Sequence, residues 1–243
     1  MMFEAYLTNV ALYATRGVEV GEYLKFPATT EEIQALLSRI EIDGKKYSEI
    51  FITNFESDVR VLSYYLDEYE DIDELNHLAH VLEEVRDKGE LAKYEAALVL
   101  GKHTASVKDL INLAQNLDIY NCQPGIETWE ALGCYYADEL MAINIPSDIR
   151  AYFDYEAYGR DIRLEEDGHF APGGYVLNNG GQFIDHYHGI EDIPHEHQVF
   201  ALPQPTDGEQ MAAYKEILDG SPQERSGNPT SQAHANRNRQ TWA

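Results

Sequence analysis

Alternation of apolar and polar residues near the start of the chain predicts three strands. Residues 3–9 alternate apolar with polar side chains, and residues 18–26 do so again after a loop through Arg16-Gly17. Pro27 ends this second strand. A turn at Asp43-Gly44 then precedes a third strand over residues 47–53, rich in Ile and Phe.

A helix is predicted between the second and third strands. Thr29 and Glu32 have the spacing of a capping box. The apolar residues that follow fall on one stripe of a helix: Ile33, Leu36, Leu37 and Ile40. Together with the three strands, this helix predicts an N-terminal α+β domain over residues 1–56.

Helical periodicity dominates the next stretch and predicts a central helical bundle over residues 57–143. Asp71 is placed to cap a first helix that ends at Gly89, and a second helix runs from residue 90 to Gly101. Ser106 begins a third helix, and residues 128–140 form a fourth. Four helices with short connections are typical of a small bundle.

The stretch over residues 148–164 mixes tyrosines with carboxylates and predicts a short helix with an aromatic inner and an acidic outer face. Gly159 is expected to end this helix in a left-handed conformation, before a strand. Residues 175–177 and 182–184 are predicted to form a hairpin around Asn178-Asn-Gly-Gly181. These elements make a C-terminal α+β domain over residues 144–200. Residues 201–243 are predicted to be a disordered tail with one possible short helix, residues 211–218.

The charge balance distinguishes this chain from an ordinary globular protein. Its 243 residues hold 43 Asp and Glu against 18 Lys and Arg, a net charge of −25. The excess is −12 over residues 1–100, −4 over 101–150, −8 over 151–200 and −1 over 201–243. Because the excess is not confined to a tail, the folded surface itself is expected to be negative. Such a surface repels nucleic acid and anionic membranes and attracts basic clefts.

The remaining composition predicts a cytoplasmic protein. Cys122 and Cys134 have no metal or redox spacing and fit a reducing compartment. The N-terminus lacks the pattern of a signal peptide, and no apolar run is long enough to span a membrane.

Two chemical alternatives follow from the polar residues. Four histidines lie close together in two pairs, as zinc ligands can: His186, His188, His195 and His197. Their spacing matches no closed metal motif, so no metal or other cofactor is predicted. Asp154, Glu156 and Asp161 could supply an acid and a base for hydrolysis, which requires one of them in an apolar pocket. Neighbouring carboxylates are expected by chance among 43, so no catalytic residue is predicted.

The stretch Tyr152-Phe-Asp-Tyr-Glu-Ala-Tyr-Gly-Arg-Asp-Ile162 resembles the signature of the ArdA antirestriction proteins. The resemblance covers roughly residues 3–190. It includes Leu7-Thr-Asn-Val10, Tyr13 and Gly17, and the run from Gly21-Glu-Tyr23 to Phe26-Pro27. The chain departs from the family in having Tyr23 in place of the usual tryptophan and Ala14 in place of asparagine.

The resemblance implies a fold and a function. ArdA proteins are acidic proteins of mobile genetic elements that mimic DNA without catalysis. They consist of three small domains in a line, α+β at both ends and helical in the centre, and assemble as an elongated, curved homodimer. They fill the DNA groove of the methyltransferase and specificity subunits of type I restriction–modification enzymes. A protein of this kind is not expected to bind nucleic acid itself.

The carboxylates expected to form the partner-binding surface lie on three segments: Asp67, Glu68, Glu70, Asp71, Asp73 and Glu74; Glu83, Glu84 and Asp87; and Asp154, Glu156, Asp161, Glu165, Glu166 and Asp167. Part of the first run also suits a helix start. Ile119, Tyr120 and Trp129 are proposed as a dimer contact, with a place in the core as the alternative. The alternative function is an acidic interaction module that binds another basic protein without mimicking DNA.

Overall fold

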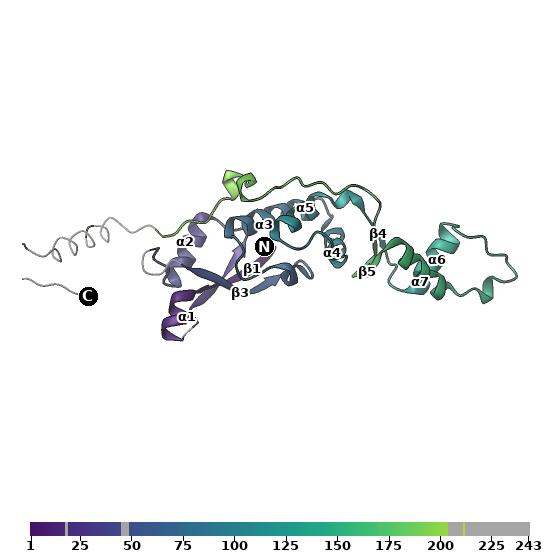
Figure 1. The fold of residues 1–243 in the computed structure, drawn as a ribbon, viewed down its shortest axis with the longest axis horizontal. Coiled ribbons are helices and arrows are strands. Elements are labelled where there is room, and N and C mark those ends of the chain that lie inside the picture. Colours follow the sequence, from purple (N-terminus) through teal and green to yellow (C-terminus); the bar gives the residue numbers. More distant parts are fainter. Residues whose placement is uncertain (18, 45–48, 204–210, 212–243) are drawn as a thin grey trace, which may run out of the picture. The chain divides into compact units, whose positions relative to one another are not determined.

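A computed structural model describes residues 1–17, 19–44, 49–203 and 211. These residues contain seven α-helices and two antiparallel sheets of three strands each (Figure 1). The chain is therefore a mixed α+β protein, as predicted. The predicted tail, including its short helix, lies outside the described residues except for residues 201–203 and Met211.

The first sheet confirms the predicted N-terminal strands. Strand β1 (Phe3–Asn9) lies between β2 (Gly21–Phe26) and β3 (Ile50–Ser57), and both pairings are antiparallel. The predicted loop after β1 is wrong, because residues 10–16 form helix α1 (Val10–Arg16). The Asn9 side chain caps this helix by accepting from Leu12 N at 3.0 Å.

Helix α2 (Thr30–Arg39) begins with the predicted capping box. Thr29 Oγ1 accepts from Glu32 N at 3.3 Å, and Glu32 Oε2 accepts from Thr29 N at 2.8 Å. The predicted apolar stripe is buried throughout, each member at most 2% exposed, which fixes the helix against the sheet.

Three central helices also start and stop where predicted. They are α3 (Ile72–Asp87), α4 (Leu91–Val99) and α5 (Val107–Gln115). Asp71 and Ser106 cap α3 and α5, and Gly89 and Gly101 follow α3 and α4 with φ of 75° and 64°. Their apolar faces join the first sheet in one hydrophobic cluster.

The second sheet contradicts two of the predictions made from the sequence. Strand β6 (Gly174–Asn178) lies between β4 (Tyr120–Pro124) and β5 (His169–Ala171), all antiparallel. The prediction that residues 120–124 belong to the helical region is wrong. The hairpin of residues 175–184 is also wrong, because β6 pairs with β4 and β5, whereas residues 182–184 form no strand.

Within the stretch of residues 148–164, the predicted helix end at Gly159 and the strand predicted after it are both wrong. Helix α7 (Tyr155–Glu166) continues through this glycine and ends at Asp167, whose φ is 54°. A Cβ atom on Gly159 would lie 1.9 Å from the carbonyl oxygen of Trp129, on helix α6 (Trp129–Cys134). A Cβ atom on Gly133 would lie 1.9 Å from Tyr155 O. The two glycines therefore allow the α6 and α7 backbones to touch, and this close approach explains Gly159 better than a helix end does.

The fourth predicted helix, α6, packs against α7 and not with α3, α4 and α5. It continues as a π-helical turn over Tyr135–Glu139, and with α7 and the second sheet it encloses a small separate cluster of Ile126, Leu132, Ile162 and Tyr175. The predicted four-helix bundle is therefore wrong in its fourth member. Residues 1–204 form one compact unit. None of the described helices is both long and apolar enough to cross a membrane.

Candidate functional site: the acidic surface

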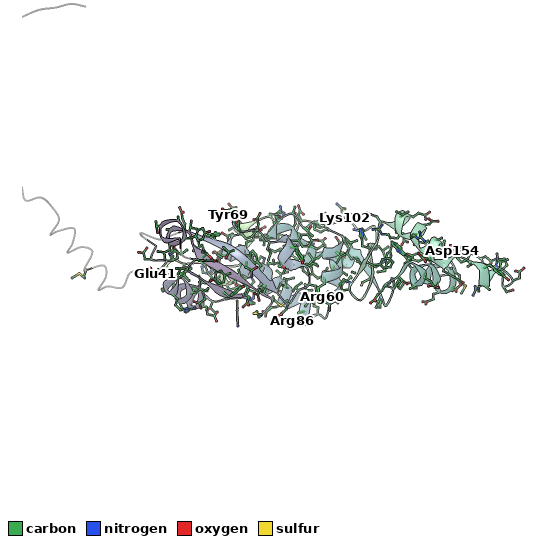
Figure 2. All side chains as sticks on the ribbon, turned by 90° about the horizontal axis from the view of Figure 1, so that it is seen from below. Glu41, Arg60, Tyr69, Arg86, Lys102 and Asp154 are labelled. Carbon is green, nitrogen blue, oxygen red and sulfur yellow. The ribbon has the colours of Figure 1, made fainter. Side chains whose placement is uncertain are left out.

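The predicted acidic side chains lie on three parts of the fold. Ten of the fifteen are exposed, and five are partly buried: Glu70, Asp73, Glu74, Glu83 and Glu166. Figure 2 labels one residue from each of two parts, Tyr69 and Asp154. We call residues 67–74, which lead into α3, the acidic turn. We call the six acids at or beside α7 the α7 carboxylates: Asp154, Glu156, Asp161, Glu165, Glu166 and Asp167.

The acidic turn is held by its own carboxylates. Asp71 Oδ1 accepts from Asp73 N at 2.9 Å and from Glu74 N at 3.0 Å, which caps α3. Glu70 Oε1 accepts from Asp67 N at 3.2 Å. Asp67 Oδ1 in turn accepts from Glu68 N at 2.6 Å. These bonds to backbone N–H groups fix a dense row of negative charge, in which one residue, Asp71, has the predicted capping role.

Two members of the acidic turn also bind a distant part of the chain. Asp73 Oδ1 accepts from Val199 N at 2.6 Å and from Phe200 N at 2.7 Å, while Glu74 Oε1 accepts from the Tyr187 hydroxyl at 3.0 Å. Burial raises the pKa of the Glu74 carboxyl, and the nearby Asp71 carboxylate raises it further. Asp73 and Glu74 therefore have a structural role that their sequence positions do not reveal.

Like charges also act on Glu70. Burial raises the pKa of its carboxyl, and the Glu74 and Asp67 carboxylates add to this effect. The turn concentrates negative charge, because residues 67–74 contain six carboxylates and no Lys or Arg. A basic partner would relieve that repulsion.

The second group lies at the end of α3. Arg86 Nη2 lies 3.4 Å from Glu83 Oε1 and 3.4 Å from Asp87 Oδ1. Glu84, on the same turn of the helix, is exposed. One arginine therefore faces two of the three carboxylates in this group, which leaves the group negative.

The α7 carboxylates are mostly exposed. Asp154 caps α7 by accepting from Ala157 N at 2.9 Å, and Glu156 forms an ion pair with Arg160 one turn later, at 3.0 Å. Asp161 and Glu165 are exposed on the same helix. None of these four lies in an apolar pocket, so the geometry gives no support to the hydrolase alternative.

Two α7 carboxylates connect the helix to its neighbours. Glu166 Oε2 accepts from the Tyr136 hydroxyl at 2.5 Å. Burial raises the pKa of this hydroxyl, and the Glu166 carboxylate raises it further. Asp167 lies 2.6 Å from Lys102 Nζ, and this hydrogen bond and charge hold the pKa of Asp167 below its usual value. Both contacts tie the end of α7 in place.

Exposed tyrosines beside the acidic turn are a feature that the sequence reasoning missed. The Tyr64 and Tyr69 side chains are 85% and 79% exposed. The Glu68 carboxylate raises the pKa of Tyr69 through its charge and a hydrogen bond. Tyr64, Asp67 and Glu68 line one hollow with Thr53 and Asn54. Aromatic faces beside carboxylates suit a guanidinium group, which can stack and form ion pairs at once.

The structure places the proposed dimer residues largely inside the chain. Ile119 is 5% exposed and Tyr120 is 1% exposed, both in the larger hydrophobic cluster. Trp129 packs edge-on against Phe170, with the Arg163 guanidinium 5.7 Å from its ring. This placement favours the alternative that Ile119 and Tyr120 belong to the core.

The histidines of the metal alternative do not come together. His186, His188 and His195 are exposed, and His188 pairs with Asp192 at 2.9 Å. His197 instead packs on α3 against His77 and His80, with ring centroids 5.1 Å and 4.0 Å away. Across the part of the chain that the structure describes, no group of three His, Cys, Asp or Glu is placed to hold a metal ion.

Comparison with known proteins identifies the family. The family model described as "Antirestriction protein (ArdA)" matches residues 5–177, which include the first sheet except for the first two residues of β1, the acidic turn and all of α7. No curated protein matches the chain. The matched segment covers more than two thirds of the sequence, and the chain therefore belongs to the ArdA family of non-catalytic antirestriction proteins.

Proposed function

We propose that this chain mimics B-form DNA with its surface carboxylates and competitively occupies the DNA-binding groove of type I restriction–modification enzymes, at the methyltransferase and specificity subunits. Family membership already implies an antirestriction function. The observation that carries the proposal further is the exposure of carboxylates on three separate parts of one fold.

The chemistry of carboxylates supports this role. Duplex DNA carries one negative charge per about 1.7 Å of its axis, and its binding proteins neutralise these charges with Lys and Arg. Carboxylates accept bidentate hydrogen bonds from Arg as phosphates do. Tyr64 and Tyr69 add aromatic faces beside Asp67 and Glu68, on which arginines of such a groove could stack.

The cations of the fold support the same conclusion, because ion pairs occupy several of them. Arg39 pairs with Glu22 at 2.7 Å, and Arg150 pairs with Asp138 at 3.3 Å. With the pairs of Arg86, Lys102 and Arg160, these contacts place each of the five cations beside a carboxylate, so that none of the five presents an isolated positive charge to a basic groove.

The proposal includes the assembly implied by the family. In that assembly, small domains in a line would form an elongated, curved homodimer. A two-fold dimer suits a target that reads two half-sites. Because Ile119 and Tyr120 are buried, the dimer contact is expected to involve other residues.

The test is a titration of the purified protein against a type I enzyme that cuts unmodified DNA, repeated at two DNA concentrations. A competitive mimic requires more protein for half-inhibition at the higher DNA concentration. Inhibition that is independent of DNA concentration would contradict mimicry and favour an acidic module that binds another basic surface. Absence of inhibition at large excess would contradict the type I target.

A further inference from the structure

Residues 182–200, which we call the strap, bind across α5 and α3 as an extended peptide. Figure 1 shows this yellow-green segment following the two helices, and hydrogen bonds from Asn112 and Asn76 to the strap backbone confirm the contact. The strap lies beyond the region that the family model matches, which ends at residue 177. It is therefore a feature of this chain that the family assignment does not explain.

Buried asparagine side chains bind the strap backbone. Asn112 is fully buried, and its Oδ1 accepts from His186 N at 2.7 Å and Tyr187 N at 2.9 Å, while its Nδ2 donates to Tyr187 O at 2.8 Å. Asn116 accepts from Ile184 N at 2.9 Å and donates to Ile184 O at 2.8 Å. Both asparagines therefore donate to and accept from the peptide backbone of the strap, as a neighbouring β-strand would.

The far end of the strap is bound by α3. Asn76, also fully buried, donates to His197 O at 3.0 Å. Asp73 accepts from the backbone N–H groups of Val199 and Phe200. Helices α5 and α3 thus hold the strap through polar side chains at both of its ends, and these bonds satisfy side chains that would be costly to bury alone.

Three histidines meet where this far end contacts α3: His77 and His80 of the helix, and His197 of the strap. His77 Nδ1 and His197 Nδ1 are 2.9 Å apart, and the His80 and His197 rings are stacked, with an interplanar angle of 12°. A hydrogen bond between two Nδ1 atoms needs a hydrogen on one ring and a lone pair on the other. When both rings are charged, both Nδ1 atoms carry hydrogens and the contact is lost.

The surroundings of the cluster favour neutral rings. Burial lowers the pKa of His77 to about 4, and the neighbouring His197 and His80 contribute to this shift. Burial and His80 also lower the pKa of His197, although the carboxylates of Glu196 and Glu84 partly oppose the shift. The Tyr187 ring lies 5.2 Å from His77, and its hydroxyl donates to Glu74. Glu31 and His195 line the hollow beside His80.

We propose that the strap is a releasable self-ligand, that protonation of the histidine cluster releases it from α3, and that release frees Asp73 and Glu74 for a basic partner. The last step rests on the proposed function. The docked strap binds one carboxylate oxygen of each residue, Asp73 Oδ1 and Glu74 Oε1, so docking and partner binding compete for these oxygens. The chain then carries a contact that limits its own acidic surface.

The sign of the pH effect follows from His77. Its pKa is about 4 in the docked state, below the ordinary value of 6.5, so the docked state prefers the neutral ring. Docking is strongest above pH 6.5 and weakens as the pH falls toward 4. Release that returns the pKa of His77 to its ordinary value of 6.5 would make docking about tenfold weaker at pH 5.5 than at pH 7.5.

Hydrogen exchange of the full chain at pH 7.5 and pH 5.5, corrected for intrinsic exchange rates, tests the release. Protection of the strap amides of Val199 and Phe200 should fall about tenfold at the lower pH, while amides inside α5 change less than twofold. The variant His77→Phe keeps a ring but cannot titrate, and should lose most of this pH dependence. The control His186→Gln, which removes an exposed strap histidine outside the cluster, should keep it. The switch would be overturned if α5 lost protection equally. It would also be overturned if the ratio of strap protection at pH 7.5 to that at pH 5.5 were unchanged in His77→Phe.

Inhibition of a type I enzyme at pH 7.5 tests the functional step. Asn112→Ala removes three hydrogen bonds to the strap without changing the charge, and Tyr187→Phe removes the hydrogen bond to Glu74. Where hydrogen exchange shows that a variant has an open strap, the concentration for half-inhibition should be several-fold lower than for the wild type. Unchanged inhibition with an open strap would overturn the release of Asp73 and Glu74. Failure of the wild-type chain to inhibit would instead contradict the proposed function, and the exchange result would be unaffected.

Discussion

The acidic turn and the α7 carboxylates carry the same kind of charge but are built differently. In the turn, Asp71, Asp73 and Glu74 accept hydrogen bonds that cap α3 and hold the strap. On α7, Asp161 and Glu165 are exposed on the middle of a helix whose inner face is fixed by glycine contacts. The same chain therefore uses some of its carboxylates to hold its own fold and leaves others exposed to a partner. The role of each carboxylate is tested by substitutions whose effects on stability and on partner binding are measured separately.

The largest effect is expected where α7 meets α6. Gly159→Ala places a methyl group against the Trp129 carbonyl, and backbone on both sides must move, so we expect a loss of about 3 kcal/mol in the free energy of unfolding. The matched control Glu165→Ala, on the exposed face of the same helix, should change it by less than about 0.5 kcal/mol. Denaturant unfolding measures both variants. Equal stability of Gly159→Ala and the control would show that the helices do not touch through their backbones.

A smaller effect separates the two acidic regions directly. Asp73→Ala leaves two strap N–H groups without their acceptor and should cost about 2 kcal/mol, whereas Asp161→Ala should cost less than about 0.5 kcal/mol. Asp73→Asn retains an acceptor oxygen and should recover part of the loss. Thermal and denaturant unfolding at neutral pH provide the measurement. A similar cost for Asp73→Ala and Asp161→Ala would remove the distinction between structural and exposed carboxylates.

The elements that the sequence predicts well are those whose signals are local. Thr29 with Glu32, Asp71 and Ser106 mark helix starts because a cap is formed within three residues of its own helix. The prediction at Gly159 is wrong because glycine signals both a helix end and a close helix contact. A partner helix some thirty residues earlier decides between the two, and no local pattern contains it.

Long-range polar contacts explain what the sequence could not give at the site. Asn112 looks like an ordinary polar position of a helix, yet it binds a backbone about 75 residues later. Asp73 and Glu74 read as surface acids because their partners lie more than a hundred residues away. Composition predicted the negative surface, but it could not say which carboxylates the fold itself uses.

Binding to a type I methyltransferase with its specificity subunit tests the central claim most directly. The dissociation constant should be measured over a range of salt concentrations for the wild type, for Asp161→Asn/Glu165→Gln, and for the control Asp185→Asn/Glu191→Gln, which removes the same charge from exposed strap positions. DNA mimicry predicts that affinity falls steeply with salt and that unmodified DNA displaces the protein. The α7 variant should bind about fivefold more weakly, with a shallower salt slope, and the control should stay near the wild type. The account would be contradicted if the affinity did not change with salt and unmodified DNA did not displace the protein, or if both variants weakened binding equally.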